Sequence, residues 1–150
     1  MKIAIVNDHW GYDLKKYIIK HLKDYNIKYF LLGNGSNIIL SMDYYDGVII
    51  KLDNFNSITY NDNLVTAGAG CSLIKLSLDT IEKGLTGMEF STGIPGCVGA
   101  SVAMNAGAYN SDISQVLKEA TILTPNNEIK VIDQDTGKPT SILKGCLRSL

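Results

Sequence analysis

The chain has 150 residues, of which 45% are hydrophobic and 19% are charged, and its formal net charge is -1. This length suits one folded domain, the composition excludes intrinsic disorder, and the scattered lysines exclude nucleic acid as an expected partner. The longest apolar run is shorter than the ~20 residues of a membrane span and the first residues lack an export pattern, so we expect a cytoplasmic protein without a membrane partner.

The first part of the chain predicts strands that alternate with a helix. Lys2 to Val6 is an expected strand, and residues 12–23 form an expected amphipathic helix with Leu14, Ile18 and Leu22 on its apolar stripe. Further strands are expected at residues 29–32 and 48–52. Because the run at 48–50 is continuously apolar, we expect burial on both of its faces and a parallel arrangement of these strands.

The second part predicts a capped helix and a hairpin. Ser72 is an expected N-cap of a helix that runs to Lys83 and stops at Gly84, with an inward face of Ile74, Leu78 and Ile81. Residues 120–124 and 128–132 are expected antiparallel strands joined by a turn at 125–127.

A glycine-containing loop follows the strand at 29–32. Residues 33–37, Gly-Asn-Gly-Ser-Asn, separate two apolar runs. One interpretation is an ordinary hairpin, since Asn-Gly between strands is a strong hairpin signal. The alternative is a loop that binds phosphate, because five glycine or polar residues lie between the runs.

A second glycine-rich segment lies at residues 88–109. Its glycines at 93, 96, 99 and 107 let the backbone approach a ligand closely, and Pro95 stiffens the turn. If a helix begins at Val98, free N–H groups near residues 96–99 would favour an anion such as a pyrophosphate, and an extended dinucleotide would fit. The alternative is a sharp turn between packed elements.

The cysteines and histidines do not suggest a metal site or disulfides. Cys71, Cys97 and Cys146 are widely separated, so we expect reduced thiols, with Cys97 as a small buried filler rather than a reactive group. His9 and His21 have no third metal-type ligand near them in the sequence, and we predict no metal site.

Three segments in order resemble one enzyme family. LGNGSNI at 32–38, DGVIIKL at 46–52 and GMEFSTGIPGCVGASVAMNAGAYNSDIS at 87–114 are similar to UDP-N-acetylenolpyruvoylglucosamine reductases, also called UDP-N-acetylmuramate dehydrogenases, over residues 27–131. The resemblance implies an α/β to α+β fold, the FAD-binding fold of the vanillyl-alcohol oxidase (PCMH-like) type, with a small parallel subdomain and an antiparallel one. It also implies a flavoprotein in which NADPH reduces FAD, and FAD reduces the UDP-N-acetylglucosamine enolpyruvate used in peptidoglycan synthesis.

The resemblance also suggests which residues bind the cofactor. The loops at 33–37 and 93–99 would bind the FAD diphosphate through backbone N–H groups, and three residues further on would line the flavin. The expected set is Gly33, Asn34, Gly35, Ser36, Asn37, Gly93, Ile94, Pro95, Gly96, Cys97, Val98, Gly99, Asn105, Gly107 and Tyr109. Ala100 replaces a glycine of the family, and no catalytic residue is assignable.

The two ends depart from the reductase pattern. Residues 1–26, with Asn7-Asp8-His9, resemble the start of type B ribose-5-phosphate isomerases, and we expect them to dock as a βα segment on the next domain. The FAD-binding domain is expected at 27–132, with two subdomains that divide near residue 60. Residues 133–150 form a divergent tail with Pro139 at the family's arginine position, and we expect a truncated chain without the third, substrate-binding domain.

Several alternatives stay open at this point. The chain is expected to be an FAD-binding portion that is incomplete for catalysis. A noncatalytic remnant or interaction module, with the glycine loops as packed turns, is one alternative, and a sugar-phosphate isomerase-like protein is another. Exposed edge strands would also permit self-association.

Overall fold

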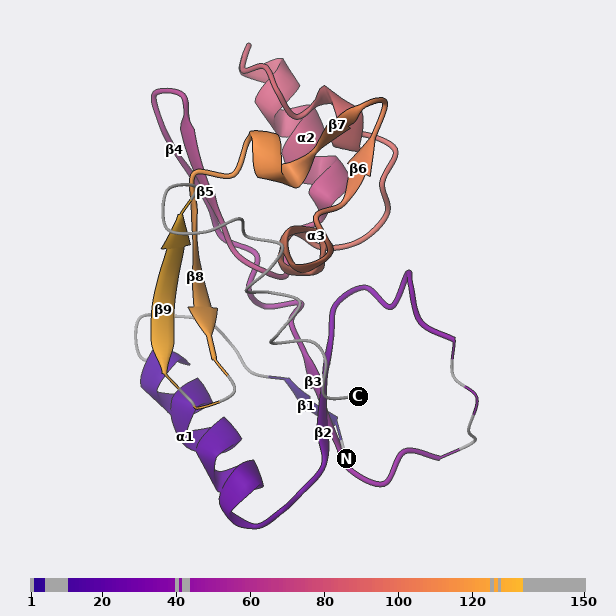
Figure 1. The fold of residues 1–150 in the computed structure, drawn as a ribbon, viewed down its shortest axis with the longest axis vertical. Coiled ribbons are helices and arrows are strands. Elements are labelled where there is room, and N and C mark those ends of the chain that lie inside the picture. Colours follow the sequence, from indigo (N-terminus) through magenta and orange to yellow (C-terminus); the bar gives the residue numbers. More distant parts are fainter. Residues whose placement is uncertain are drawn as a thin grey trace.

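The computed structural model describes residues 2–4, 11–39, 41, 44–124, 126 and 128–133 (Figure 1). The expectations for Ile5, Val6 and His9 lie outside these residues, as do those for Cys146 and the tail from residue 134 onward.

A small parallel sheet forms one end of the molecule. It contains β1 (Lys2–Ala4), β2 (Tyr29–Leu32) and β3 (Val48–Lys51) in the order β1-β3-β2, and both pairings are parallel, as expected. Val48 and Ile50 of the central strand are buried, whereas Ile49 is half-buried. The prediction of burial on both faces therefore holds only in part, because the described residues bury the side of β3 with Val48 and Ile50 more fully than the side with Ile49.

Helix α1 (Gly11–Asp24) lies beside the sheet (Figure 1). Ile19 and Leu22 are buried in one cluster with Val48 and Ile50, and Ile18 packs against this cluster. The predicted stripe is confirmed at Leu22 and partly at Ile18, and the side chain of Leu14 lies outside the described residues. Pairing of β1 with β3 places the N-terminal segment in the same sheet.

The antiparallel strands of the described residues form three separate ladders rather than one sheet. They are β4 (Ile58–Asn61) with β5 (Leu64–Ala67), β6 (Gly107–Ala108) with β7 (Ser111–Asp112), and β8 (Glu119–Leu123) with β9 (Ile129–Asp133). The last pair is the hairpin expected from the sequence. The parallel sheet ends at Lys51, and residue 60, where a subdomain division was expected, lies inside β4.

Helices surround a second core between these ladders. The elements are α2 (Leu73–Glu82), the 3-10 turn η1 (Glu89–Ser91), α3 (Val98–Met104) and the 3-10 turn η2 (Ile113–Gln115). Leu73, Phe90 and Ile113 are its buried centre. The Lys75 N–H donates to Ser72 Oγ at 3.3 Å, which confirms the predicted N-cap, and Gly84 follows the helix with φ +72°.

The predicted inward face of α2 is wrong. The helix buries Leu73, Leu76, Ser77 and Thr80, whereas Leu78 is 48% exposed and Ile81 is 42% exposed. Two neighbouring stripes compete here, and the one that packs contains small hydroxyl residues. Ser77 Oγ donates to the Met88 carbonyl at 2.6 Å, which brings the chain before η1 close to the helix. Ile74, on the predicted stripe, is half-buried.

The helices are short. None in the described ranges has the length and apolar character needed to cross a lipid bilayer.

Candidate functional site

The two predicted glycine loops lie against each other. A Cβ on Gly33 would lie 2.4 Å from Cys97 Sγ, so the first loop touches the second at its start. Ser36 Oγ donates to the Pro95 carbonyl at 3.4 Å, although 59 residues separate the two. Gly96 has φ +136°, a conformation that L side chains rarely adopt. The hairpin interpretation of residues 33–37 is wrong, because β2 pairs with β3 in parallel.

A third loop, residues 68–72, is hydrogen-bonded to the second glycine loop, residues 93–99. The Val98 N–H donates to the Cys71 carbonyl at 2.9 Å, and the Gly99 N–H donates to the Ala69 carbonyl at 2.8 Å. These two N–H groups were expected to be free for an anion, and that part of the expectation is wrong. The protein itself satisfies the start of α3, because loop 68–72 presents two carbonyl groups there.

Glycines make this close approach possible. A Cβ on Gly70 would lie 1.8 Å from the Leu52 carbonyl oxygen, and one on Gly99 would lie 2.8 Å from Ala69 Cβ. Sequence reasoning missed loop 68–72 as part of the site. The available signal was Ala-Gly-Ala-Gly at residues 67–70, between a strand and a capped helix.

Loops 33–37 and 93–99 contain main-chain N–H groups that make no hydrogen bond among the described residues. Within the described part of the chain, no main-chain N–H of residues 33–37 donates to a protein acceptor, and the same holds for Gly93, Gly96 and Cys97. A Cβ on Gly93 would meet no heavy atom within 4 Å. Open space beside a glycine with neighbouring free amides suits a diphosphate, which binds main-chain N–H groups and excludes side chains.

Side chains complete the contact between the loops. Asn37 Nδ2 lies 3.7 Å from Met104 Sδ, at the C-terminal end of α3. Cys97 is only 1% exposed and fills the space beside Gly33, as a small buried residue does. Cys71 is also a buried free thiol, and burial raises its pKa.

Three further residues, Asn105, Gly107 and Tyr109, were expected to line the flavin. They do not take part in the contacts that join loops 33–37 and 93–99. Asn105 ends α3 with φ +47°, and its Oδ1 accepts the Ser114 N–H at 2.9 Å, so this atom is already used. Gly107 lies in β6, where a Cβ would be 2.7 Å from the Ser111 carbonyl oxygen. Figure 1 shows β6 and β7 at the end of the molecule opposite the parallel sheet.

Tyr109 lies in the turn between β6 and β7. It is 89% exposed and has φ +53°. With Gly87, Glu89, Phe90 and Ser111 it lines an open depression of about 360 Å³. No hydrogen bond joins it to residues 33–37 or 93–99 in the described ranges.

Comparisons with known proteins identify the family to which this chain belongs. The FAD binding domain family matches residues 15–133 of this chain. The chain belongs to this family. Its cofactor is therefore FAD, and its fold is the FAD-binding fold of the vanillyl-alcohol oxidase (PCMH-like) type.

Individual relatives show how much of a larger protein the chain matches. UDP-N-acetylenolpyruvoylglucosamine reductase from Clostridium perfringens is 42% identical over 117 residues, which are 78% of this chain and 38% of that protein. The homologous enzyme from Clostridium tetani is 42% identical over 119 residues, 79% of this chain and 39% of that protein. The chain thus spans about two-fifths of the length of these relatives. The reductase resemblance of the sequence is confirmed.

Solved structures confirm the fold. UDP-N-acetylenolpyruvylglucosamine reductase from Thermus caldophilus superimposes with a TM-score of 0.69 at 24% identity, covering 93% of this chain and 48% of that chain. 6-Hydroxy-D-nicotine oxidase from Arthrobacter nicotinovorans superimposes with a TM-score of 0.61 at 18% identity, covering 80% of this chain and 28% of that chain.

Metal ligands do not gather in this site. Among the described residues, no group of three or more His, Cys, Asp or Glu side chains is placed to bind a metal ion.

Proposed function

We propose that this chain is the FAD-binding portion of an NADPH-dependent UDP-N-acetylenolpyruvoylglucosamine reductase. The observation behind the proposal is the contact between loops 33–37 and 93–99 together with the open space beside Gly93. The reductase names of the Clostridium relatives support the reaction class. We propose peptidoglycan precursor synthesis in the cytoplasm as its setting, since NADPH and nucleotide sugars are cytoplasmic metabolites.

In this proposal the main chain binds the diphosphate. The N–H groups of residues 33–37, with those of Gly93, Gly96 and Cys97, would donate to its oxygens, since none of them donates to a protein acceptor in the described residues. Bound flavin supplies hydride transfer. The residues of this chain orient the cofactor, and residues 68–72 keep the second loop in place through the bonds to Val98 and Gly99.

The remaining predicted contacts are part of the same proposal. Tyr109 offers an exposed ring for the flavin side of the ligand, and Asn105, whose side chain already bonds the Ser114 N–H and Asp112, would line it at the end of α3. The substrate would be the enolpyruvyl ether of a UDP-sugar, and NADPH would donate the hydride to FAD. The proposal includes self-association through β2, which is an edge strand of the parallel sheet in the described residues.

FAD titration of the purified chain tests the proposal. We expect quenching of flavin fluorescence and an altered visible absorption spectrum as FAD binds. Replacing Gly93 with valine adds a side chain where the protein itself leaves room, so the free energy of unfolding should change by less than about 0.5 kcal/mol. The same change should weaken FAD binding at least tenfold, because it fills the ligand's space.

Two results would contradict the proposal. Unmodified chain that gives no spectral change with FAD would favour the alternative of packed turns or an interaction module. Normal FAD affinity in Gly93→Val would place the ligand elsewhere. The isomerase-like alternative depends on His9, outside the described residues, and conversion of ribose-5-phosphate by the chain would support it.

A further inference from the structure

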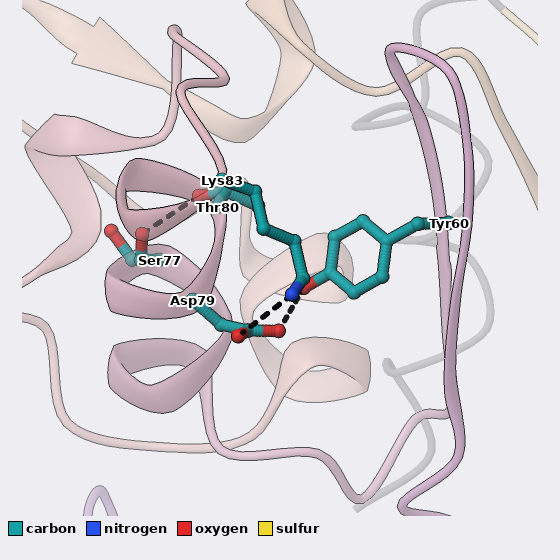
Figure 2. Close-up of polar contacts among 5 residues, drawn as sticks. All are labelled: Tyr60, Ser77, Asp79, Thr80 and Lys83. Carbon is teal, nitrogen blue, oxygen red and sulfur yellow. Dashed lines mark hydrogen bonds and ion pairs between the residues drawn. The ribbon is translucent and has the colours of Figure 1, made fainter.

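A polar cluster joins the β4–β5 hairpin to α2 (Figure 2). The hydroxyl of Tyr60, in β4, donates to Asp79 Oδ2 on α2. Lys83 Nζ lies 3.6 Å from the other carboxylate oxygen of Asp79 and 4.9 Å from the centre of the Tyr60 ring. Each of the three side chains therefore contacts the other two.

The charges in this cluster suit a lasting contact. Partial burial of the phenol, together with its bond to Asp79, raises the pKa of Tyr60 to about 12. The same hydrogen bond, with the nearby Lys83, lowers the pKa of Asp79. Near neutral pH the phenol is thus a donor and the carboxylate an acceptor, which is a charge-assisted hydrogen bond.

The two elements joined by the cluster flank loop 68–72. β5 ends at Ala67 and α2 begins at Leu73, so the loop spans the short gap between them. Backbone bonds fix its first half, because the Gly68 N–H donates to the Ser57 carbonyl and the Gly70 N–H to the Phe55 carbonyl. Tyr60 makes the polar side-chain contacts between the hairpin, residues 58–67, and α2 with its C-cap Lys83. The described residues contain no other polar side-chain contact between these two elements.

Loop 68–72 in turn sets the position of loop 93–99. Two backbone hydrogen bonds connect them, from the Val98 N–H to the Cys71 carbonyl and from the Gly99 N–H to the Ala69 carbonyl, and a third joins the Leu73 N–H at the start of α2 to the Gly96 carbonyl. Because Gly68 and Gly70 are bonded to residues 57 and 55, a shift of α2 relative to the hairpin would move the Cys71 carbonyl relative to the Ala69 carbonyl, and the start of α3 bonds to both. Misplacing such loop amides reduces their contact with a ligand that requires several of them together.

We propose that Tyr60 is a positioning residue for FAD binding, which acts by fixing α2 against the β4–β5 hairpin through Asp79. This inference rests on the proposed function of loops 33–37 and 93–99. Tyr60 itself does not contact the cofactor in this proposal, and its effect passes through loop 68–72.

Variants of the cluster test the inference by FAD affinity. The dissociation constant is measured by flavin fluorescence at a temperature at which circular dichroism shows each variant fully folded, so that a loss of global stability alone does not change it. We expect Tyr60→Phe, which keeps the ring over Lys83, and Asp79→Ala each to raise the constant about threefold or more. Asp79→Asn retains an acceptor oxygen and should give a smaller rise. The double variant Tyr60→Phe/Asp79→Ala should bind FAD no more weakly than Asp79→Ala alone, because Asp79→Ala already removes the hydrogen bond from Tyr60.

A matched control uses a surface ion pair away from the site. Lys20→Met removes the bond to Asp24, 2.5 Å long on α1, and should leave FAD affinity unchanged. An unchanged affinity in Tyr60→Phe, while the unmodified chain binds FAD, would overturn the positioning role alone. An equal loss in the Lys20 variant would overturn it too. Failure of the unmodified chain to bind FAD would overturn the proposed function and this inference with it.

Discussion

Glycines in the candidate site have different physical tasks. Gly70 is required by packing, since a Cβ there would lie 1.8 Å from a carbonyl oxygen. Gly96 is required by its backbone, with φ +136°. Gly93 has neither constraint, because a Cβ there would meet open space and φ is not positive. A glycine that its own fold does not require suggests a requirement from a ligand, and this makes Gly93 the most informative position for mutation.

The free energy of unfolding at low pH depends on Asp79. Its pKa is lowered from 3.8 in the folded chain, chiefly by the Tyr60 hydroxyl. The stabilising contribution is therefore complete above the unfolded-state pKa and is lost as pH falls through the lower folded-state pKa. We expect the difference in unfolding free energy between the unmodified chain and Asp79→Asn to shrink below about pH 4. Urea unfolding at several pH values measures this, and parallel pH profiles would contradict it.

At the level of elements, α2 has two apolar stripes and packs with one. The sequence contains leucine or isoleucine at 73, 74, 76, 78 and 81, so an inward face at Ile74, Leu78 and Ile81 is as regular as the observed one. The choice depends on Phe90 and Ile113, which are distant in sequence and contact Leu73 in the folded chain. Periodicity alone lacks this information, and the helix was predictable while its orientation was not.

Two leucine substitutions test the orientation of α2. Leu73 is 1% exposed and lies in the second core, so Leu73→Ala should reduce the free energy of unfolding by about 2–5 kcal/mol. Leu78 is 48% exposed, and Leu78→Ala should cost less than about 1 kcal/mol. Denaturant unfolding of the pair provides the comparison. Equal losses would show that the outer stripe also packs.

The sequence was enough to locate the two glycine loops, but not to predict which groups they contact. Gly33 to Asn37 and Gly93 to Gly99 stand out by composition, and the structure places them together. The start of α3 was expected to offer free N–H groups, yet Cys71 and Ala69 accept two of them. A third segment with small side chains can approach a helix end as closely as a phosphate can, and local sequence does not distinguish the two.

At the level of the whole molecule, the described residues form two separate buried clusters, one beside the parallel sheet and one among the helices and 3-10 turns. One contains α1 and β3, and the other contains residues of α2, η1 and η2. The alternation of strands and helices predicted the parallel part, and the hairpin motif predicted β8 and β9. The division of the remaining antiparallel strands into short ladders depends on long-range packing, which no local pattern reports.

Ligand linkage gives a test of the whole fold. FAD at one hundred times its dissociation constant should stabilise the folded chain by about 2.7 kcal/mol. For a chain of this length the midpoint of thermal unfolding should rise by roughly 5–10 °C. Riboflavin lacks the diphosphate that the two loops are proposed to bind, so it should give a smaller rise at the same concentration. Equal shifts with both ligands would contradict a diphosphate site, and differential scanning fluorimetry with a dye outside the flavin band measures them.

Loops 33–37 and 93–99 contain no lysine or arginine. In the proposed complex a doubly anionic bridge therefore meets only neutral amide dipoles from these segments, on a chain whose own formal charge is -1. Dipoles act over short distances, so dissolved ions would screen little of this attraction, and added sodium chloride would change cofactor retention far less than at a site built from cationic side chains.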